Sequence, residues 1–429
     1  MGLAGKIADR TAEVGVVGLG YVGVPLALAA AEAGFLVRGI DVDAEKVEEL
    51  LGGKSQDLHV DPTKLAEAIE KGTFVPTTDH SVLAEASVIL VCVPTPLKDG
   101  SPDMSFVEKA AKEIGTVLSP QTLVILESTS YPGTTDELLR GILEETSSLT
   151  AGKDFWLGFS PERIDPGLKG ASVTDVPKIV GGIDNASTDL MTAFYGTFVQ
   201  TVVPVSSPKA AEMTKLLENT YRHVNIALAN EIGMVCRDLG IDVWEVIEAA
   251  ATKPFGFQPF YPGPGWGGHC IPVDPAYLSW SVRRSGKTAR FVELAREINL
   301  AMPAYVVEQI AECLNGQGQS VQGTTIIVLG VAYKADVADE RGAPSLEIIS
   351  RLIKSGATAI FHDPYIEKLT ISGEVIERTG LDEGLDKAGL TVIVTDHSDY
   401  DWEQIVSRSK MVLDTRNATK GLKGNIVRL

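Results

Sequence analysis

The chain has 429 residues and carries 38 Lys and Arg against 57 Asp and Glu, a formal net charge of −19 at pH 7. So acidic a chain repels phosphate backbones and anionic lipid, which excludes nucleic acid and membranes as natural partners. With 44% apolar and 22% charged residues, the composition is that of a globular protein, and a length of this size predicts two or three domains.

The cysteines and the N-terminus predict a location in the reducing cytosol. Four cysteines without a CxxC pair form neither a disulfide framework nor a zinc site, so we expect no bound metal. The first 13 residues are polar and carry both charge signs, unlike a signal peptide. Residues 14–31 are uncharged and nominally long enough to span a membrane. They contain four glycines and Pro25, however, which favours a strand, a glycine turn and a buried helix.

The first third of the chain alternates between strand and helix patterns. Such alternation predicts a doubly wound parallel sheet. We expect strands at 13–19, 35–41, 87–94 and 122–129, two further strands at 155–162 and 177–182, and helices at 25–34 and 44–53.

The middle of the chain is helical and the last third alternates again. Residues 208–240 predict one long helix, or two helices broken near Gly233, followed by helices at 242–252 and 286–315. The last third predicts strands at 324–334, 358–364, 390–396 and 411–416, with a helix at 345–356. We therefore expect an α/β protein with two Rossmann-like doubly wound lobes joined by a central all-α domain, divided as 1–206, 207–314 and 315–429.

A glycine motif near the N-terminus predicts a dinucleotide site. Residues 18–23 read G-x-G-x-x-G, directly after a predicted strand and at the start of a predicted helix. In this context the glycines allow a tight turn, close approach of a pyrophosphate and close packing of helix on strand. Asp41 ends the next strand, where a carboxylate accepts hydrogen bonds from the adenosine ribose and repels a 2′-phosphate. NAD is thus favoured over NADP, with a glycine-rich turn without cofactor as the alternative.

A glycine- and proline-rich stretch, residues 261–275, surrounds a single cysteine, Cys270. Few side chains in such a loop leave backbone N–H groups able to approach a ligand. A lone cysteine is ordinarily a buried small hydrophobe, but beside an NAD fold it suggests covalent oxidation of an aldehyde. Asp274, four residues on, is a candidate base, or alternatively a turn cap before Pro275.

Further candidates lie on the long helix and at strand ends. Lys215 and Asn219 are spaced i and i+4, so they share a helix face where they could stabilise an oxyanion; the alternative is a solvated lysine. Glu162 and Thr129 each follow a predicted strand, where α/β sites usually lie. In the last third, Lys334, Arg341 and Arg416 are candidates for an anion pocket, or for surface pairing with nearby carboxylates.

The sequence resembles the UDP-glucose/GDP-mannose dehydrogenase family over nearly its whole length. The resemblance rests on ordered motifs: VGLGYVGVPLA (17–27), VCVPTP (91–96), ESTSYPGTT (127–135), FSPERIDPG (159–167), KLLENTYRHVNIALANE (215–231), PGPGWGGHCIPVDP (262–275), LGVAYKADVADERGAPS (329–345) and DTRN (414–417). It implies oxidation of the 6-hydroxymethyl group of a nucleotide sugar to a carboxylate, using two NAD in turn. It also implies a dimer formed by the central helices, an NAD-binding domain at 1–206 and a UDP-sugar-binding domain at 315–429.

The resemblance also implies roles for single residues. Cys270 would be the nucleophile, Lys215 and Asn219 would stabilise the oxygen anion, and Asp274, Glu162 and Thr129 would assist proton transfer through water. The expected NAD contacts are Gly18, Gly20, Tyr21, Val22, Gly23, Asp41, Pro94, Thr95, Thr129 and Lys334. The expected substrate contacts are Glu162, Arg163, Lys215, Asn219, Phe260, Tyr261, Gly267, Lys334, Arg341 and Arg416.

The sugar is the open question within the family. An arginine after the glutamate, here Arg163, resembles the pattern of bacterial enzymes that act on UDP-N-acetylglucosamine or UDP-N-acetylmannosamine. UDP-N-acetylglucosamine is the expected substrate. The same chemistry on UDP-glucose or GDP-mannose stays open. Gln258 and Trp266 depart from the subgroup's usual methionine and smaller apolar residue. Outside this chemistry, the chain could be a non-catalytic nucleotide-sugar sensor or a two-electron dehydrogenase of the β-hydroxyacid type.

Overall fold

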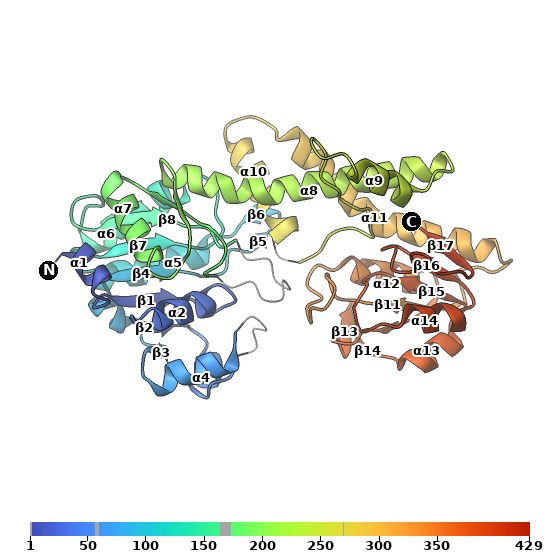
Figure 1. The fold of residues 1–429 in the computed structure, drawn as a ribbon, viewed down its shortest axis with the longest axis horizontal. Coiled ribbons are helices and arrows are strands. Elements are labelled where there is room, and N and C mark those ends of the chain that lie inside the picture. The colour runs from blue at the N-terminus through green and yellow to red at the C-terminus, as the bar shows by residue number, and fades with distance from the viewer. Residues whose placement is uncertain (1, 56–59, 164–172, 269) are drawn as a thin grey trace. The chain divides into compact units, whose positions relative to one another are not determined.

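The computed structural model describes residues 2–55, 60–163, 173–268 and 270–429 (Figure 1). The chain forms two compact units. The N-terminal unit comprises Met1–Glu218 and Ala276–Lys287, and the C-terminal unit comprises Asn219–Pro275 and Thr288–Leu429. The division falls within two helices, α8 (Pro208–Asp238) and α10 (Cys270–Arg284).

The N-terminal unit is built on an eight-stranded sheet in the order β10-β9-β8-β7-β4-β1-β2-β3. Neighbouring strands are parallel except β8 and β9, which pair antiparallel. The predicted doubly wound sheet is therefore confirmed, apart from this one reversed pairing. The strands are β1 (Glu13–Val17), β2 (Leu36–Ile40), β3 (Phe74–Thr77), β4 (Val88–Val91), β7 (Leu123–Leu126), β8 (Trp156–Phe159), β9 (Lys178–Gly182) and β10 (Val202–Pro204), with a small hairpin of β5 (Leu97–Lys98) and β6 (Ser101–Pro102).

Helices of this unit begin where side chains satisfy their first free N–H groups. Asp43, Asp61 and Asp184 accept such bonds at the starts of α3, α4 and α7. The helices are α1 (Leu3–Ala8), α2 (Gly23–Glu32), α3 (Ala44–Leu51), α4 (Pro62–Glu70), α5 (Ser105–Val117), α6 (Arg140–Ser147) and α7 (Asn185–Tyr195), with a 3₁₀ turn η1 (His80–Glu85) and a π-helical turn η2 (Thr134–Leu139).

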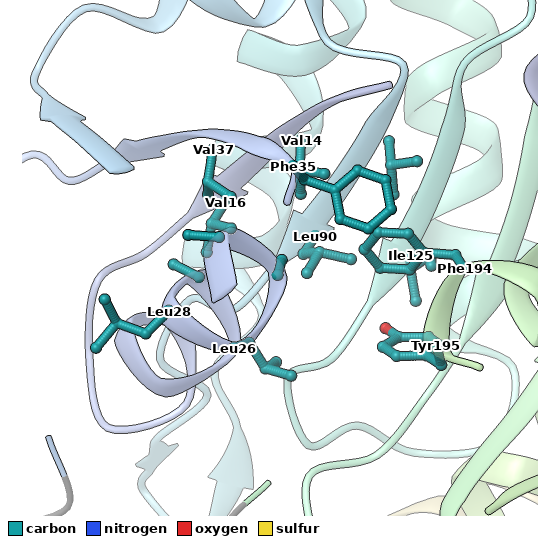
Figure 2. Packing of buried hydrophobic residues seen from close by; sticks show 14 of the residues in the cluster. Val14, Val16, Leu26, Leu28, Phe35, Val37, Leu90, Ile125, Phe194 and Tyr195 are labelled. Carbon is teal, nitrogen blue, oxygen red and sulfur yellow. The ribbon is translucent and has the colours of Figure 1, made fainter. Parts of the chain in front are cut away.

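The core of the N-terminal unit lies on the central strands (Figure 2). Val14 and Val16 of β1 are fully buried, as expected for a strand covered on both faces. Leu26 of α2 is buried in the same cluster. Phe35, just before β2, packs on Phe194 of α7 with ring centroids 5.5 Å apart. This packing fixes β1, β2 and α2, the elements that carry the glycine motif.

Helix α8 is one unbroken helix, which confirms the first of the two alternatives predicted for this segment and excludes a break near Gly233. A Cβ at Gly233 would lie 3.1 Å from Cβ of Pro262, so a larger side chain would press on the 262 segment. The glycine thus allows that segment to pack closely on α8 and does not end the helix.

The C-terminal unit contains a five-stranded sheet in the order β12-β11-β15-β16-β17, and all four pairings are parallel. Pro344 opens α12, where its missing N–H leaves no bond unmade. The elements are α9 (Val243–Ala251), α11 (Arg290–Asn315), β11 (Thr325–Leu329), α12 (Pro344–Lys354), β12 (Thr358–His362), β13 (Lys368–Ile371), β14 (Glu374–Glu377), α13 (Leu381–Lys387), β15 (Leu390–Ile393), α14 (Trp402–Arg408), β16 (Val412–Asp414) and β17 (Ile426–Arg428).

One prediction about local structure was wrong. The stretch 261–275 was expected to be a loop throughout, but helix α10 starts at Cys270 and includes Pro272 and Pro275. Pro272 is tolerated because it lies in the first turn, where N–H groups have no partner within the helix. Across the described residues no helix combines the length and the apolarity that a membrane crossing requires.

Candidate active site

The glycine turn after β1 has the geometry of a dinucleotide site. Gly18 has a φ of 95°, and a Cβ there would lie 2.7 Å from the carbonyl oxygen of Cys92. A Cβ at Gly23 would collide with the carbonyl oxygen of Gly18, so this glycine brings α2 close to the strand. Gly20 has no atom within 4 Å of an added Cβ. The first and third glycines therefore serve the turn, while the second faces open space that a pyrophosphate could occupy.

The acidic residue expected at the ribose is held at the end of β2. The Asp41 carboxylate accepts hydrogen bonds from the backbone N–H of Leu19 at 2.9 Å and of Asp43 at 3.0 Å. Its Oδ2 also pairs with Lys46 Nζ at 3.1 Å. Helix α2 has no side-chain cap at its N-terminus, where the helix dipole favours an anion, although the N–H of Val24 is bonded to the carbonyl oxygen of Gly20. The residues present therefore fit a bound dinucleotide.

The segment after β4 is fixed by residues that the sequence analysis did not single out. Ser128 Oγ donates to the carbonyl oxygen of Val93 at 2.7 Å. The Tyr277 hydroxyl donates to the carbonyl oxygen of Thr95 at 2.9 Å. Thr95 is buried, while Pro94 is exposed and Thr129, three residues after β7, is half-buried. Ser128 could have been noticed, since it is a polar residue two positions after an apolar strand.

Glu162 lies between charged neighbours in the N-terminal unit. Lys215 Nζ donates to the carbonyl oxygen of Glu162 at 2.6 Å, and the backbone N–H of Arg163 donates to Glu162 Oε1 at 2.7 Å. The Arg163 guanidinium forms two hydrogen bonds to Glu218, at 3.1 and 2.5 Å, and one to the carbonyl oxygen of Pro177. Arg163 was expected to contact substrate, and a substrate would have to compete with Glu218 for it.

A second carboxylate on α8 was missed by the sequence analysis. Glu212 is fully buried and accepts from the backbone N–H groups of Gly133 and Thr135 and from the Thr135 hydroxyl. Burial raises its pKa to about 7, although these donors oppose the shift. Glu212 thereby binds the first turn of η2 to α8.

The nucleophile candidate and its base candidate share one helix of the chain. Cys270 is the first residue of α10 and is partly buried, and Asp274 lies one turn further on. A thiol at a helix N-terminus is more readily deprotonated, because the partial positive charge there stabilises the thiolate. Asn219 Nδ2 donates to Asp274 Oδ2 at 2.5 Å, and both side chains are buried. Two residues predicted to act in catalysis are therefore in direct contact.

The glycines before Cys270 have a different role from the one expected. A Cβ at Gly267 would lie 2.7 Å from Cβ of Tyr333, and one at Gly263 would lie 2.8 Å from a guanidinium nitrogen of Arg416. The N–H of Gly268 donates to the carbonyl oxygen of Arg341 at 3.0 Å. This N–H is bonded within the chain, and the approach of the segment's N–H groups to a ligand stays a prediction. These glycines let the segment pack against the chain's own third lobe.

Polar contacts to α8 hold the same segment. The backbone N–H of Gly263 donates to Asn230 Oδ1 at 2.9 Å. Trp266 Nε1 donates to His223 Nδ1 at 2.9 Å, and the two rings stack. His223 therefore keeps its proton on Nε2, which faces the carbonyl oxygen of Val292. Burial lowers the pKa of His223, which keeps it neutral. Trp266, unusual for the subgroup, thus has a structural partner.

The cationic candidates of the third lobe differ in their surroundings. The Arg341 guanidinium pairs with Asp339 at 2.6 Å and is largely exposed, which is the surface pairing considered from the sequence. Arg416 Nε donates to the carbonyl oxygen of Val394 at 2.8 Å, and burial lowers the pKa of its guanidinium. Lys334 is half-buried in the segment after β11.

Two aromatic candidates pack against helices of the same unit. The Phe260 ring lies 5.7 Å from that of Tyr221, and the Tyr261 ring stacks on Trp244 at 5.8 Å. Tyr221 also donates from its hydroxyl to Gln258 Oε1 at 2.9 Å. Gln258, like Trp266, therefore has a partner on α8.

Comparison with known proteins identifies the family of the chain. Residues 12–199, 209–301 and 327–421 match, in order, the NAD binding, central and UDP binding domains of the UDP-glucose/GDP-mannose dehydrogenase family. The chain belongs to this family. It is 35% identical to a UDP-N-acetyl-D-mannosamine dehydrogenase of Methanocaldococcus jannaschii, over 94% of this chain and 91% of the relative. An NDP-N-acetyl-D-galactosaminuronic acid dehydrogenase of Ralstonia solanacearum is 33% identical, over 95% and 97% of the two chains.

The fold comparison agrees. The structure of a UDP-D-ManNAc dehydrogenase from Pyrococcus horikoshii matches 97% of this chain and 98% of its own, with a TM-score of 0.89 and 32% identity. The chain is thus an NAD-dependent nucleotide-sugar dehydrogenase, an enzyme as predicted, with NAD as its cofactor. The roles of the individual residues remain predictions.

Proposed function

We propose that this dehydrogenase oxidises the 6-hydroxymethyl group of a UDP-linked 2-acetamido sugar to a carboxylate in two steps, through a thioester on Cys270. The observation that carries the proposal is the first turn of α10, where Cys270 opens the helix and Asp274 is bonded to Asn219. A sensor that only binds a nucleotide sugar would need no thiol at a helix N-terminus.

The reaction divides into two oxidations and one hydrolysis. Bound NAD supplies the hydride acceptor for each oxidation. The C6 hydroxyl loses a proton and a hydride, giving an aldehyde, and the Cys270 thiolate adds to the aldehyde carbon. Loss of a second hydride to NAD and of the hydroxyl proton converts the thiohemiacetal to a thioester. Water then cleaves the C–S bond and releases the carboxylate and the thiol. The covalent bond keeps the intermediate on the enzyme while the first NADH leaves and a second NAD enters.

The side chains of the site have separate tasks in this scheme. We assign stabilisation of the C6 oxyanion to Lys215 and Asn219, whose positively polarised N–H groups stabilise developing negative charge. Asp274 takes the proton of the thiol or of water, and Glu162 and Thr129 assist the hydrolysis. The contact between Asn219 and Asp274 supports a shared task for this pair.

The sugar is assigned by the names of the relatives. The names of relatives at 33–35% identity specify a sugar with a 2-acetamido group. We therefore place UDP-N-acetylmannosamine first and UDP-N-acetylglucosamine, the substrate expected from the sequence motifs, second. UDP-glucose and GDP-mannose lack the acetamido group and come last.

NADH formation with each of these four nucleotide sugars tests the assignment. The preferred substrate gives two NADH for each sugar consumed, together with a uronic acid. One NADH and a released aldehyde or ketone would contradict the four-electron course. Equal rates with UDP-glucose and the acetamido sugars would contradict the assignment of the sugar.

Cys270→Ser tests the covalent step. The serine variant retains binding of NAD and of the nucleotide sugar, measured by calorimetry, but forms no acid. Serine preserves shape and helix position, so a loss of binding would point to structural damage. Acid formation at the wild-type rate would overturn the thioester.

We also propose that the chain is a homodimer and that its domains divide at 206 and 314. Support for the dimer comes from an apolar stripe on α8, with residues spaced three, four or seven apart and each more than a third exposed: Met213, Leu217, Tyr221, Leu228, Ile232 and Val235. A second copy would cover such a stripe, because one helix of this length presents a long self-complementary face. Sedimentation velocity distinguishes the dimer from a monomer.

A further inference from the structure

A buried polar cluster in the N-terminal unit has no task in the reaction scheme above. Its members are Glu127, directly after β7, Lys178, which opens β9, and Tyr195, which ends α7. The side chains of Glu127 and Lys178 are 0% and 6% exposed. Tyr195 is fully buried, and Figure 2 shows it at the edge of the apolar core.

The Glu127 carboxylate accepts hydrogen bonds from both of the other side chains. Lys178 Nζ donates to Glu127 Oε2 at 2.6 Å, and the Tyr195 hydroxyl donates to Glu127 Oε1. Lys178 Nζ also lies 5.3 Å from the centre of the Tyr195 ring. A buried ion pair costs much of its attraction in lost hydration and is often replaceable by apolar residues without loss of stability. Stability alone is therefore a weak reason for this pair.

Lys178 also reaches the segment that carries Glu162. Its Nζ donates to the carbonyl oxygen of Pro161 at 3.2 Å and lies 3.8 Å from Glu162 Oε2. Lys215 holds the same segment through the carbonyl oxygen of Glu162. Two lysines therefore fix residues 161 and 162, and Lys178 places its ammonium beside the Glu162 carboxylate as well.

We propose that Lys178, held in place by Glu127 and Tyr195, is a positioning residue for Glu162 in hydrolysis of the thioester. This inference rests on the proposed role of Glu162. The ammonium orients the Glu162 carboxylate, which accepts a proton from water. Glu127 and Tyr195 act one step further away, by fixing the ammonium.

The charges around the cluster support this role. Burial lowers the pKa of Lys178, but the negative charges of Glu127 and Glu162 outweigh it, so the net direction is upward and the ammonium persists. Burial raises the pKa of Glu127 to about 7. Within the described part of the chain, Lys215 from α8 bonds the carbonyl oxygen of Glu162, and the Cys92 thiol, whose pKa burial raises, also interacts with Glu162.

The test separates hydrolysis from hydride transfer. Lys178→Met alone leaves Glu127 buried without its cation and could unfold the chain. The double variant Lys178→Met/Glu127→Gln removes both charges and keeps an acceptor for Tyr195. In rapid mixing with NAD and UDP-N-acetylmannosamine or UDP-N-acetylglucosamine, it should form two NADH per site at the wild-type rate. Steady turnover should then fall by about tenfold or more. Intact-mass measurement should show the sugar acyl group on Cys270.

Matched variants provide the controls. Lys178→Arg should restore part of the rate, because it restores the positive charge. The exposed pair Lys209–Glu137 gives a matched control, and Lys209→Met/Glu137→Gln should behave as wild type. Glu162→Gln should accumulate the same acyl enzyme.

Three outcomes would overturn the inference. If the double variant releases acid as fast as wild type while Glu162→Gln does not, Lys178 has no part in the step. If the double variant slows both hydride transfers as much as hydrolysis, the cluster is only structural. If Glu162→Gln itself releases acid normally, the assumed role of Glu162 fails and the inference falls with it. The last result is distinguishable from failure of the thioester, which Cys270→Ser reports separately.

Discussion

Each of the two sheets has an aspartate at the equivalent position, but the two aspartates have different roles. In each, an acidic residue follows the second strand of a β-α-β unit and binds the segment after the first strand. Asp41 follows β2 and accepts from Leu19, and Asp363 follows β12 and accepts from the N–H groups of Val331 and Ala332, at 2.7 and 3.1 Å. Both also accept from the N–H two residues further on.

The two carboxylates differ in how much of their hydrogen-bond acceptor capacity the protein leaves unused. Asp363 is 0% exposed and accepts two further bonds, from the N–H of Ile366 and from His397 Nε2 at 2.9 Å. His397 in turn accepts the N–H of Asp336, so the segment bearing Lys334 is fixed at both ends. Asp41 is 8% exposed, and its ionic partner, Lys46, is itself partly exposed. The position of an aspartate in the fold therefore does not decide whether it binds a ligand or holds the structure. The number of carboxylate acceptor sites that remain open to a ligand decides it.

Of the substitutions considered, Asp363→Asn should have the largest effect on stability. The amide replaces an acceptor with a donor against N–H groups that already point inward, which leaves buried donors unpaired. We expect the free energy of unfolding of the C-terminal unit to fall by about 3 kcal/mol. Urea unfolding followed by circular dichroism measures the loss. Calorimetric titration with NAD should show unchanged affinity, and a large loss of NAD affinity would contradict the separation of roles.

Glu212 sharpens the comparison, because it is an acid committed to structure within the N-terminal unit. Its folded pKa of about 7 lies above the ordinary value of 4.5, so the folded chain binds this proton more tightly than the unfolded chain. The stability that this group contributes is therefore full below about pH 4.5 and is lost as the pH rises to about 7. Glu212→Gln does not titrate.

The measurement for Glu212 is a difference between two proteins. The unfolding free energy of wild type minus that of Glu212→Gln should decrease by about 2 kcal/mol between roughly pH 5 and pH 8. Urea titrations of both proteins across this range give the difference directly. A difference that stays constant, or increases with pH, would show that the donors around Glu212 outweigh its burial.

Asp41→Asn should have the smallest effect on stability and a specific effect on the cofactor. Loss of the charged acceptor weakens binding of NAD by about tenfold, the value of one charge-assisted hydrogen bond. Removal of the negative charge should narrow the preference for NAD over NADP. Fluorescence titration with both cofactors measures this. Asp43→Asn, an exposed cap of α3, serves as the control, and equal losses in the two variants would show that ribose contact is not the cause.

The sequence predicted those parts of the site whose signal is local. The strands β1, β4 and β7 were found because apolar β-branched runs are typical of strands buried on both faces. The turn at 18–23 was found because each glycine has its own backbone requirement. Lys215 and Asn219 lie on one regular helix, α8, as predicted, and their role stays a prediction.

Contacts between distant segments could not be predicted in this way. Glu127 and Lys178 are 51 residues apart, and no pattern near either indicates the other. The start of α10 at Cys270 was missed because prolines and glycines around it are typical of loops. The antiparallel pairing of β8 with β9 has no local signal, because side-chain burial is the same in either direction.

The sequence by itself thus determined the central parallel strands, the long helix α8, the glycine turn and the family, since these depend on periodicity and on residues close together in the chain. Only the tertiary structure decided what each polar group binds. It committed Asp363 to its own lobe, packed the glycines at 263–268 against the chain and joined Lys178 to Glu127. The physical reason is that a buried polar group must find its partner wherever the fold places one, and sequence distance does not restrict that choice.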